Sequence, residues 1–230
     1  MNFLQLAQAV KRESGLSGSG PLSVVTATGD DARIFQWVNW AWRDIALLHE
    51  GWLFRRASAQ GLTSAMFMPH DQGLPGFSLS DFGSWKLPDP EYRVYAYAQD
   101  DGVQAERPLR FMGWDSFRAR FVVGAQIPGP LAFWSVNPAG VLSVGPMPDR
   151  PHVVRADYIR DVLDMTADQD VPPLPARFHM VLVWRALSEY AGFDAASEVF
   201  QRASGNLASQ LSALRQAQLP RIGFGARPLA

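Results

Sequence analysis

The first apolar residues of the chain recur every three or four positions, which predicts a short amphipathic helix at the N-terminus. Its apolar positions are Phe3, Leu4, Leu6, Ala7 and Val10. Asn2 can cap this helix, because its side-chain oxygen can accept a backbone N–H of the first turn. Gly15 and the Gly-rich stretch up to Pro21 end the helix and begin a loop, after which residues 22–27 can form a short extended segment.

A longer amphipathic helix is predicted next, with Thr28 or Asp30 as its cap and Gly51 beyond its end. The expected core stripe is Ile34, Val38, Ala41, Ile45 and Leu48, with Phe35 and Trp42 beside it. The opposite side carries Arg33, Gln36, Asn39 and Arg43. Trp40 and Leu47 fall toward this polar side. Trp40 therefore either packs beneath a loop or contacts another subunit, since aromatic residues are enriched at interfaces.

The middle of the chain, from Trp52 to about Asp164, has short runs of β-branched and aromatic residues separated by Pro and Gly, which is typical of a β-rich module. The Pro-rich stretches 69–90 and 124–130 are expected to be loops. The pattern does not specify how the strands are ordered in a sheet. The expected strands are 52–58, 63–68, 92–97, 107–112, 118–123, 131–136, 140–144 and 152–159.

Helical periodicity returns after an acidic, Pro-containing connector at residues 165–175. A mostly apolar helix is expected over 176–192, with Pro175 in its first turn, and a last helix is expected from a cap at Asp194 to Gln218. The apolar positions of that last helix are Val199, Leu207, Leu211 and Leu214.

These patterns together predict an α+β fold, in which a helical bundle from the N- and C-terminal helices carries a central β-rich insertion and an extended C-terminal tail. The expected domains are a helical core of residues 1–51 and 165–218, a β-rich module of residues 52–164 and the C-terminal tail of residues 219–230.

Composition narrows the classes of function. The chain of 230 residues is 47% hydrophobic and 19% charged, which is enough to form a packed core. Its net charge of −1 argues against a freestanding nucleic-acid-binding protein. The absence of cysteine excludes disulfides, thiolate zinc sites and cysteine nucleophiles. No apolar run approaches about 18 residues and no signal-peptide pattern is present, so we expect no membrane span and folding in a cytoplasm.

The search for chemistry finds no catalytic, cofactor or metal site. The four histidines, His49, His70, His152 and His179, are not at metal-ligand spacing. His70 and Asp71 are expected in a solvated loop, and His179 in the core or an interface. The sequence has no G-x-S-x-G, phosphate loop or dinucleotide fingerprint, so a small hydrolase or nuclease has no support, and we expect no enzyme activity.

Charge is distributed unevenly near the C-terminus. One group of carboxylates is interpreted as a solvated acidic edge rather than as paired catalytic acids: Asp157, Asp161, Asp164, Asp168 and Asp170. Beyond Glu198 the chain has no acidic residue, whereas Arg215, Arg221 and Arg227 are basic. An acidic edge and a basic end can pair with copies of the same protein or with an acidic partner surface.

The first 56 residues carry a series of short motifs. These are N-F-L-Q-L at 2–6, S-G-x-G-P at 17–21, A-R-x-x-x-W-V at 32–38, A-W-x-D-I at 41–45 and W-L-x-x-R at 52–56. In this order they resemble the head-to-tail adaptor family of tailed bacteriophages, whose members bind the portal as a connector ring. Beyond residue 56 the resemblance is one of architecture only.

The resemblance implies a structural virion protein at the head–tail junction, assembled in the host cytoplasm, with no cofactor. Twelve copies would form a ring beneath the portal protein, extend the channel for genomic DNA without sequence readout, and give a platform for the tail tube or nozzle protein. The expected portal-docking residues lie in the C-terminal tail and are Arg221, Ile222, Phe224 and Arg227. The alternative interpretation is that this segment is only a frayed terminus with no partner. The expected intersubunit residues are Trp40, Arg43 and Arg215.

A second hypothesis explains the aromatic, strand-rich centre of the chain. In that reading the protein is a β-rich tail or baseplate module that binds glycan or another tail protein. It leaves the helices at both ends of the chain and the C-terminal tail unexplained.

Overall fold

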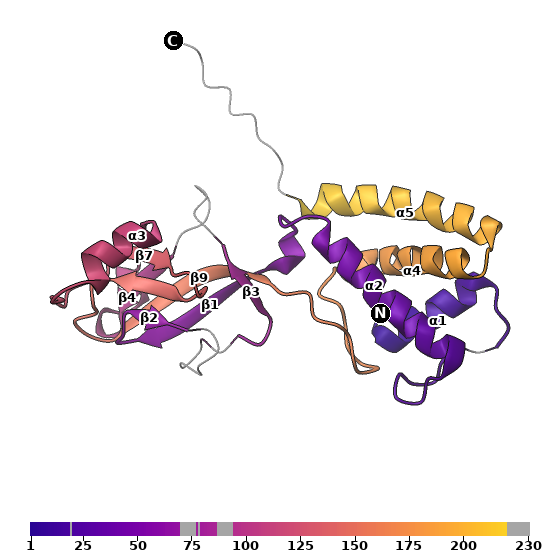
Figure 1. Ribbon diagram of the computed structural model, residues 1–230, viewed down its shortest axis with the longest axis horizontal. Coiled ribbons are helices and arrows are strands. Elements are labelled where there is room, and N and C mark those ends of the chain that lie inside the picture. Colours follow the sequence, from indigo (N-terminus) through magenta and orange to yellow (C-terminus); the bar gives the residue numbers. More distant parts are fainter. Residues whose placement is uncertain (19, 70–76, 78, 87–93, 220–230) are drawn as a thin grey trace, which may run out of the picture. The chain divides into compact units, whose positions relative to one another are not determined.

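The computed structural model describes residues 1–18, 20–69, 77, 79–86 and 94–219. The chain divides into two compact units, a helical unit of Met1–Arg55 with Val162–Ala230 and a β unit of Arg56–Asp161. The predicted α+β class is confirmed: helices form at both ends of the sequence, and the β-rich insertion lies between them in chain order (Figure 1). The predicted C-terminal tail lies outside the described residues, apart from Leu219.

The helical unit has one hydrophobic core, formed by four long helices. Helix α4 packs against the other three helices and buries eight of its 14 residues. The helices are α1 (Phe3–Ser14), α2 (Gly29–Leu47), α4 (Met180–Phe193) and α5 (Ser197–Gln218), with short 3-10 turns η1 (Leu53–Arg55) and η5 (Ala176–Phe178). The central place of α4 explains why its sequence is apolar on nearly every side.

The ends of α1 form as the sequence predicts. Asn2 accepts a hydrogen bond from the Gln5 backbone N–H, and the Gln5 side chain bonds the Asn2 backbone in return, which makes a capping box. Gly15 ends the helix with a φ of 76°, a left-handed conformation that favours glycine.

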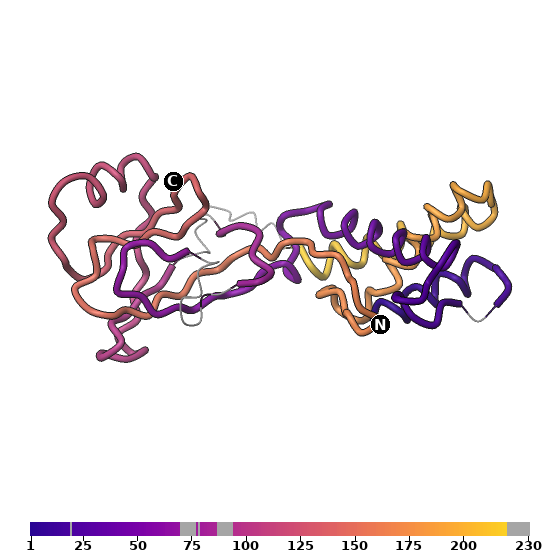
Figure 2. Tube along the Cα trace, turned by 60° about the horizontal axis from the view of Figure 1, so that its bottom comes forward, coloured from indigo at the N-terminus to yellow at the C-terminus, as the bar shows by residue number. Residues whose placement is uncertain are grey.

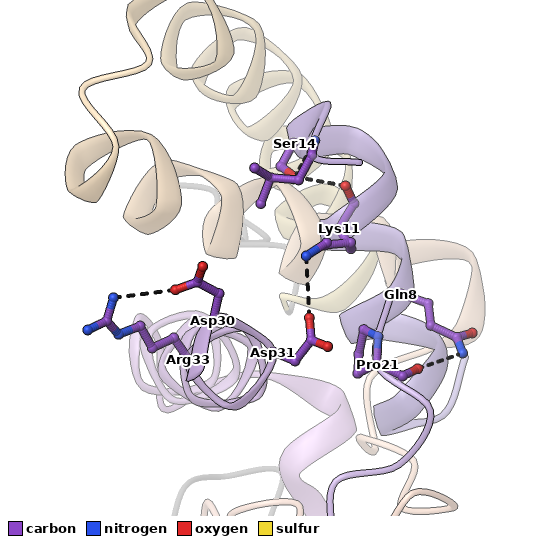
Figure 3. Close-up of polar contacts among 8 residues, drawn as sticks. Gln8, Lys11, Ser14, Pro21, Asp30, Asp31 and Arg33 are labelled. Atoms are coloured by element: carbon purple, nitrogen blue, oxygen red, sulfur yellow. Dashed lines mark hydrogen bonds and ion pairs between the residues drawn. The ribbon is translucent and has the colours of Figure 1, made fainter. Parts of the chain in front are cut away.

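The extended segment predicted at residues 22–27 is wrong, because the chain there makes turns. One polar contact joins α1 to the loop that follows it, and another joins α1 to α2 (Figure 3). The Gln8 side chain donates to the Pro21 carbonyl at 3.1 Å, and Lys11 pairs with Asp31 at 3.4 Å.

Helix α2 buries most of the predicted stripe, including Ile34, Val38, Ala41 and Ile45. Leu48 is an error of prediction, because the helix ends at Leu47 and leaves Leu48 45% exposed. Thr28 holds the N-cap position, although its side chain makes no capping hydrogen bond with the described first turn. Beyond the helix, the fully buried Trp52 donates from Nε1 to the Ile45 carbonyl at 2.9 Å and closes this end of the core.

The β unit contains two sheets over a separate core (Figure 2 traces the chain). In one, β9 is the central strand, because β1 pairs along its length while β4 and β3 pair with its first and last residues. The order β1-β9-β4-β5 describes this sheet apart from β3, and the other sheet has the order β2-β8-β7-β6. The strands are β1 (Arg56–Thr63), β2 (Phe67–Met68), β3 (Phe82–Trp85), β4 (Tyr95–Ala98), β5 (Arg107–Pro108), β6 (Arg110–Phe111), β7 (Phe133–Val136), β8 (Leu142–Gly145) and β9 (His152–Arg160). Short helical turns η2 (Gln99–Asp101) and η3 (Val103–Ala105) join β4 to β5.

Two strand predictions are wrong at positions where helical turns form instead. The run 118–123 is helical, because α3 (Trp114–Phe117) continues into a π-helical turn, η4 (Arg118–Val122). Phe117 and Phe121, four residues apart, are both buried, so helical spacing decides the structure where the sequence also shows alternation. The predicted strand 52–58 begins only at Arg56, since η1 precedes it.

Other element boundaries shift. Strand β3 lies inside the predicted loop 69–90, where Trp85 stacks on Phe77 with ring centroids 5.2 Å apart. Helix α5 begins at Ser197 rather than at a cap on Asp194. The Asp194 side chain instead accepts a hydrogen bond from the Tyr190 hydroxyl at 2.7 Å, so Asp194 stabilises the end of α4.

Candidate assembly surface

The described residues contain no group of His, Asp or Glu side chains that could hold a metal ion. Within the same residues, no helix is long and apolar enough to cross a bilayer. His70 and Asp71 lie outside the described residues. His179 is 1% exposed, and its two ring nitrogens contact the Met1 amine and, at 2.8 Å, the Leu174 carbonyl. Burial lowers the pKa of His179, and of the two predicted locations, core or interface, the structure of the single chain shows the core.

Two of the carboxylates interpreted as a solvated acidic edge, Asp168 and Asp170, are bound by backbone groups of the chain, whereas Asp161 and Asp164 are exposed as predicted. Asp170 accepts hydrogen bonds from the backbone N–H groups of Ala167 and Thr166, which lower the pKa of its carboxyl group. Asp168 accepts the Val24 backbone N–H at 2.7 Å and so fixes the loop between α1 and α2 to the connector. Asp168 and Asp170 therefore shape the connector of the helical unit.

The outward side of α2 carries large apolar side chains. Trp40 is 42% exposed and Leu47 is 63% exposed, so the interpretation that Trp40 packs beneath a loop is wrong. Exposed apolar residues continue past the helix end with Leu48 and Leu53. A run of exposed apolar side chains on one element is typical of a surface that another protein covers.

The other two intersubunit candidates have different surroundings. Arg43 lies one turn beyond Trp40 and binds Asp164, with Nε 2.7 Å from Oδ1. Arg215 is exposed in the last turn of α5, and its side chain makes no hydrogen bond or ion pair with the described residues. The structure therefore places Trp40 and Arg43 near each other on α2 and leaves Arg215 on a separate helix.

Helix α5 is covered on one side only. It buries just Ala203 and Leu214 of its 22 residues, and Phe200 remains 49% exposed. Between Arg202 and Arg215 it has no charged residue. Its exposed positions in that stretch are small: Gly205, Ala208, Ser209, Ser212 and Ala213. A long, uncharged helical face of this kind has little desolvation cost when another surface covers it.

A groove lies where the end of α2 meets α4 and α5. We call it the leucine groove, and its volume is about 470 Å³. Its lining residues are Asp44, Ile45, Leu47, Leu48, Arg185, Leu207 and Leu211. At its edge Arg185 binds Asp44 and, one turn along α4, Glu189, each at 2.6 Å.

Sequence reasoning missed this groove. Leu207 and Leu211 are assigned to the core by their helical spacing, and Arg185 to a buried helix, although each lines the groove. The only contact at the groove that the sequence could have indicated is the ion pair of Arg185 with Glu189, because residues i and i+4 of a helix are neighbours. The groove residues at the end of α2 are distant in sequence from those of α4 and α5.

The sequence of the chain matches a known protein family. The family model described as SU10 adaptor protein matches residues 1–228, which is nearly the whole chain. No curated protein matches the chain.

Proposed function

The chain belongs to the SU10 adaptor protein family of phage head-to-tail adaptors, and from this membership we propose that its copies form a ring beneath the portal protein. Membership supports a structural role in the virion, and the proposal locates that role at the head–tail junction. The proposal adds that the ring extends the DNA channel and provides the platform on which the tail tube or nozzle docks.

The observation that carries the proposal is the incomplete coverage of the helical unit. Helix α5 buries two residues of 22, and α2 exposes Trp40 and Leu47 on its outward side. Neighbouring copies would cover these faces. Because the two faces belong to different helices, their contact would be heterologous, and repetition of such a contact closes a ring when the rotation fits.

Charge is compatible with a channel. The net charge of the chain is −1. A wall that lets a polyanion slide should avoid strong phosphate binding, which needs clustered Lys and Arg. The ring would therefore pass DNA without sequence readout.

We further propose that the C-terminal tail docks on the portal through Arg221, Ile222, Phe224 and Arg227. The chain has no acidic residue after Glu198, so the C-terminal tail is purely basic and apolar. A short segment of this composition can bind a groove on a partner and becomes ordered there at an entropic cost.

The test is co-sedimentation with DNA-filled capsids that lack tails, using intact protein and a version that ends at Gln218. We expect several copies of intact protein per capsid and a strong loss for the truncated version. Equal binding of both would refute portal docking by the C-terminal tail. Binding of neither would refute the adaptor role of this chain, and glycan or tail-protein binding by the β unit would then be tested first.

A further inference from the structure

The leucine groove has an apolar floor that is exposed to solvent in the single chain. Leu47 and Leu48 on its α2 side are 63% and 45% exposed, and Leu207 and Leu211 on its α5 side are half-buried. The groove is open to solvent and has a volume of about 470 Å³. We propose that in the unassembled protein this groove holds the chain's own C-terminal tail, with Phe224 on the leucine floor.

Charge at the edge of the groove favours this occupant. Arg185 is shared by two carboxylates, Asp44 and Glu189, whose side chains are 48% and 33% exposed. Among the described residues one negative charge is therefore left uncompensated at this edge. The C-terminal tail carries Arg221 and Arg227 with no acidic residue, so it supplies the missing positive charge.

Chain length selects Phe224 as the residue that reaches the floor. At 1.5 Å per helical residue, Leu211 lies about 12 Å back along α5 from Leu219, where the described chain ends. An extended chain spans at most about 3.6 Å per residue, so Ile222 reaches only about 11 Å and Phe224 about 18 Å. Phe224 is thus the first bulky apolar residue of the C-terminal tail that can return to Leu211 of the same copy.

An intramolecular segment binds at a high effective concentration, typically millimolar for a short flexible link, so weak contacts suffice to fill the groove. The consequence for assembly rests on the proposed function. If the portal takes Phe224, the same side chain leaves the groove, and Leu47 and Leu48 become available to a neighbouring copy. Docking on the portal would in this way release the surface that joins copies laterally, and free protein would stay unassembled.

The absence of cysteine from the chain permits a direct test by disulfide cross-linking. The test protein carries Leu48→Cys with Gly225→Cys, beside the proposed anchor. The matched control carries Leu22→Cys with Gly225→Cys, because Leu22 is also exposed, at 81%, but lies in the loop before α2. Helix α2 has 19 residues, which separates that loop from the groove by about 28 Å.

Under mild oxidation of dilute full-length protein, we expect the test pair to form an intramolecular disulfide at least about tenfold faster than the control, by mass spectrometry of peptides. Adding Phe224→Ala to the test pair should reduce its rate to that of the control. Equal rates for the two pairs would overturn the proposal. Disulfides that form only between copies would also overturn it, because they assign the groove to a second copy.

The same proteins separate this inference from the proposed function. The reduced test protein should co-sediment with tailless capsids, and the cross-linked protein should not, since its C-terminal tail is held in the groove. Fast cross-linking without capsid binding in the reduced state would refute the portal role and leave the groove assignment intact. Capsid binding with slow cross-linking would refute the groove assignment alone.

Discussion

Arg43 and Asp164, which are 121 residues apart, are joined by a two-point ion pair in which Nε lies 2.7 Å from Oδ1. The neighbouring Trp42 donates to the Leu163 carbonyl at 3.0 Å, and Asn39 exchanges hydrogen bonds with the backbone of Met165. One side of α2 thus fixes the chain where it re-enters the helical unit. Arg43 therefore has a role within the chain, whatever it contacts in a ring.

Replacement of Arg43 should lower the stability of the isolated protein, in the absence of any partner. Because both side chains are partly exposed, the pair contributes about 0.5–1 kcal/mol. We expect Arg43→Ala and Asp164→Ala to lower the free energy of unfolding by similar amounts in urea. The double variant should lose little more than either single variant. Fully additive losses would show that the two residues stabilise the protein independently.

Two neighbouring tryptophans should behave in opposite ways. Trp40 is 42% exposed and Trp42 only 2% exposed. We expect Trp40→Ala to change the free energy of unfolding by less than about 0.5 kcal/mol and to weaken binding to tailless capsids. Trp42→Ala should lose about 3–5 kcal/mol, because it leaves a cavity in the core. Normal capsid binding by Trp40→Ala would remove Trp40 from the proposed subunit contact.

Stability should fall in mild acid because of His179. Burial lowers its pKa in the folded protein, so the unfolded chain takes up a proton first, near its ordinary value of about 6.5. The free energy of unfolding should therefore keep its highest value above that pH, and it should decrease as the pH falls below it. Urea denaturation between pH 7.5 and pH 5.5, values chosen to span the reference pKa of about 6.5, measures this slope. His179→Gln should flatten it, and an unchanged slope would assign the effect to other groups.

The Asp168 carboxylate should control the loop between α1 and α2. Its hydrogen bond to the Val24 N–H is charge-assisted, and such bonds contribute about 1.5–3 kcal/mol. We expect Asp168→Ala to speed hydrogen exchange at Val24 by about tenfold or more. Asp30→Ala is the control, because Asp30 pairs only with Arg33 within the described residues, at 3.5 Å across one turn of α2 (Figure 3). Equal effects of the two variants would contradict the assignment.

The features that the sequence predicted correctly are those that follow a local periodic pattern. The caps and stripes of α1 and α2 were readable because a helix places every third or fourth residue on one side. The strand predicted at 118–123 failed because the alternation of Arg and apolar residues there also fits the helical pair Phe117 and Phe121. Alternation over so few residues does not separate the two periods.

The candidate site was less accessible to sequence reasoning. Trp40 and Leu47 could be placed on the polar side of α2, because only the period of one helix was needed. The leucine groove brings Leu48, which follows α2, together with Arg185 of α4 and Leu207 of α5, and α2 is far from both of those helices in the sequence. Such a contact depends on tertiary packing, and no local period contains it.

The most direct test of the proposed ring is electron microscopy of tailless capsids saturated with this protein. The account predicts a closed ring beneath the portal, of twelve copies if the family resemblance holds for stoichiometry, with α2 and α5 of adjacent copies in lateral contact. Isolated copies on the portal, or a ring in which α2 and α5 face solvent, would contradict it.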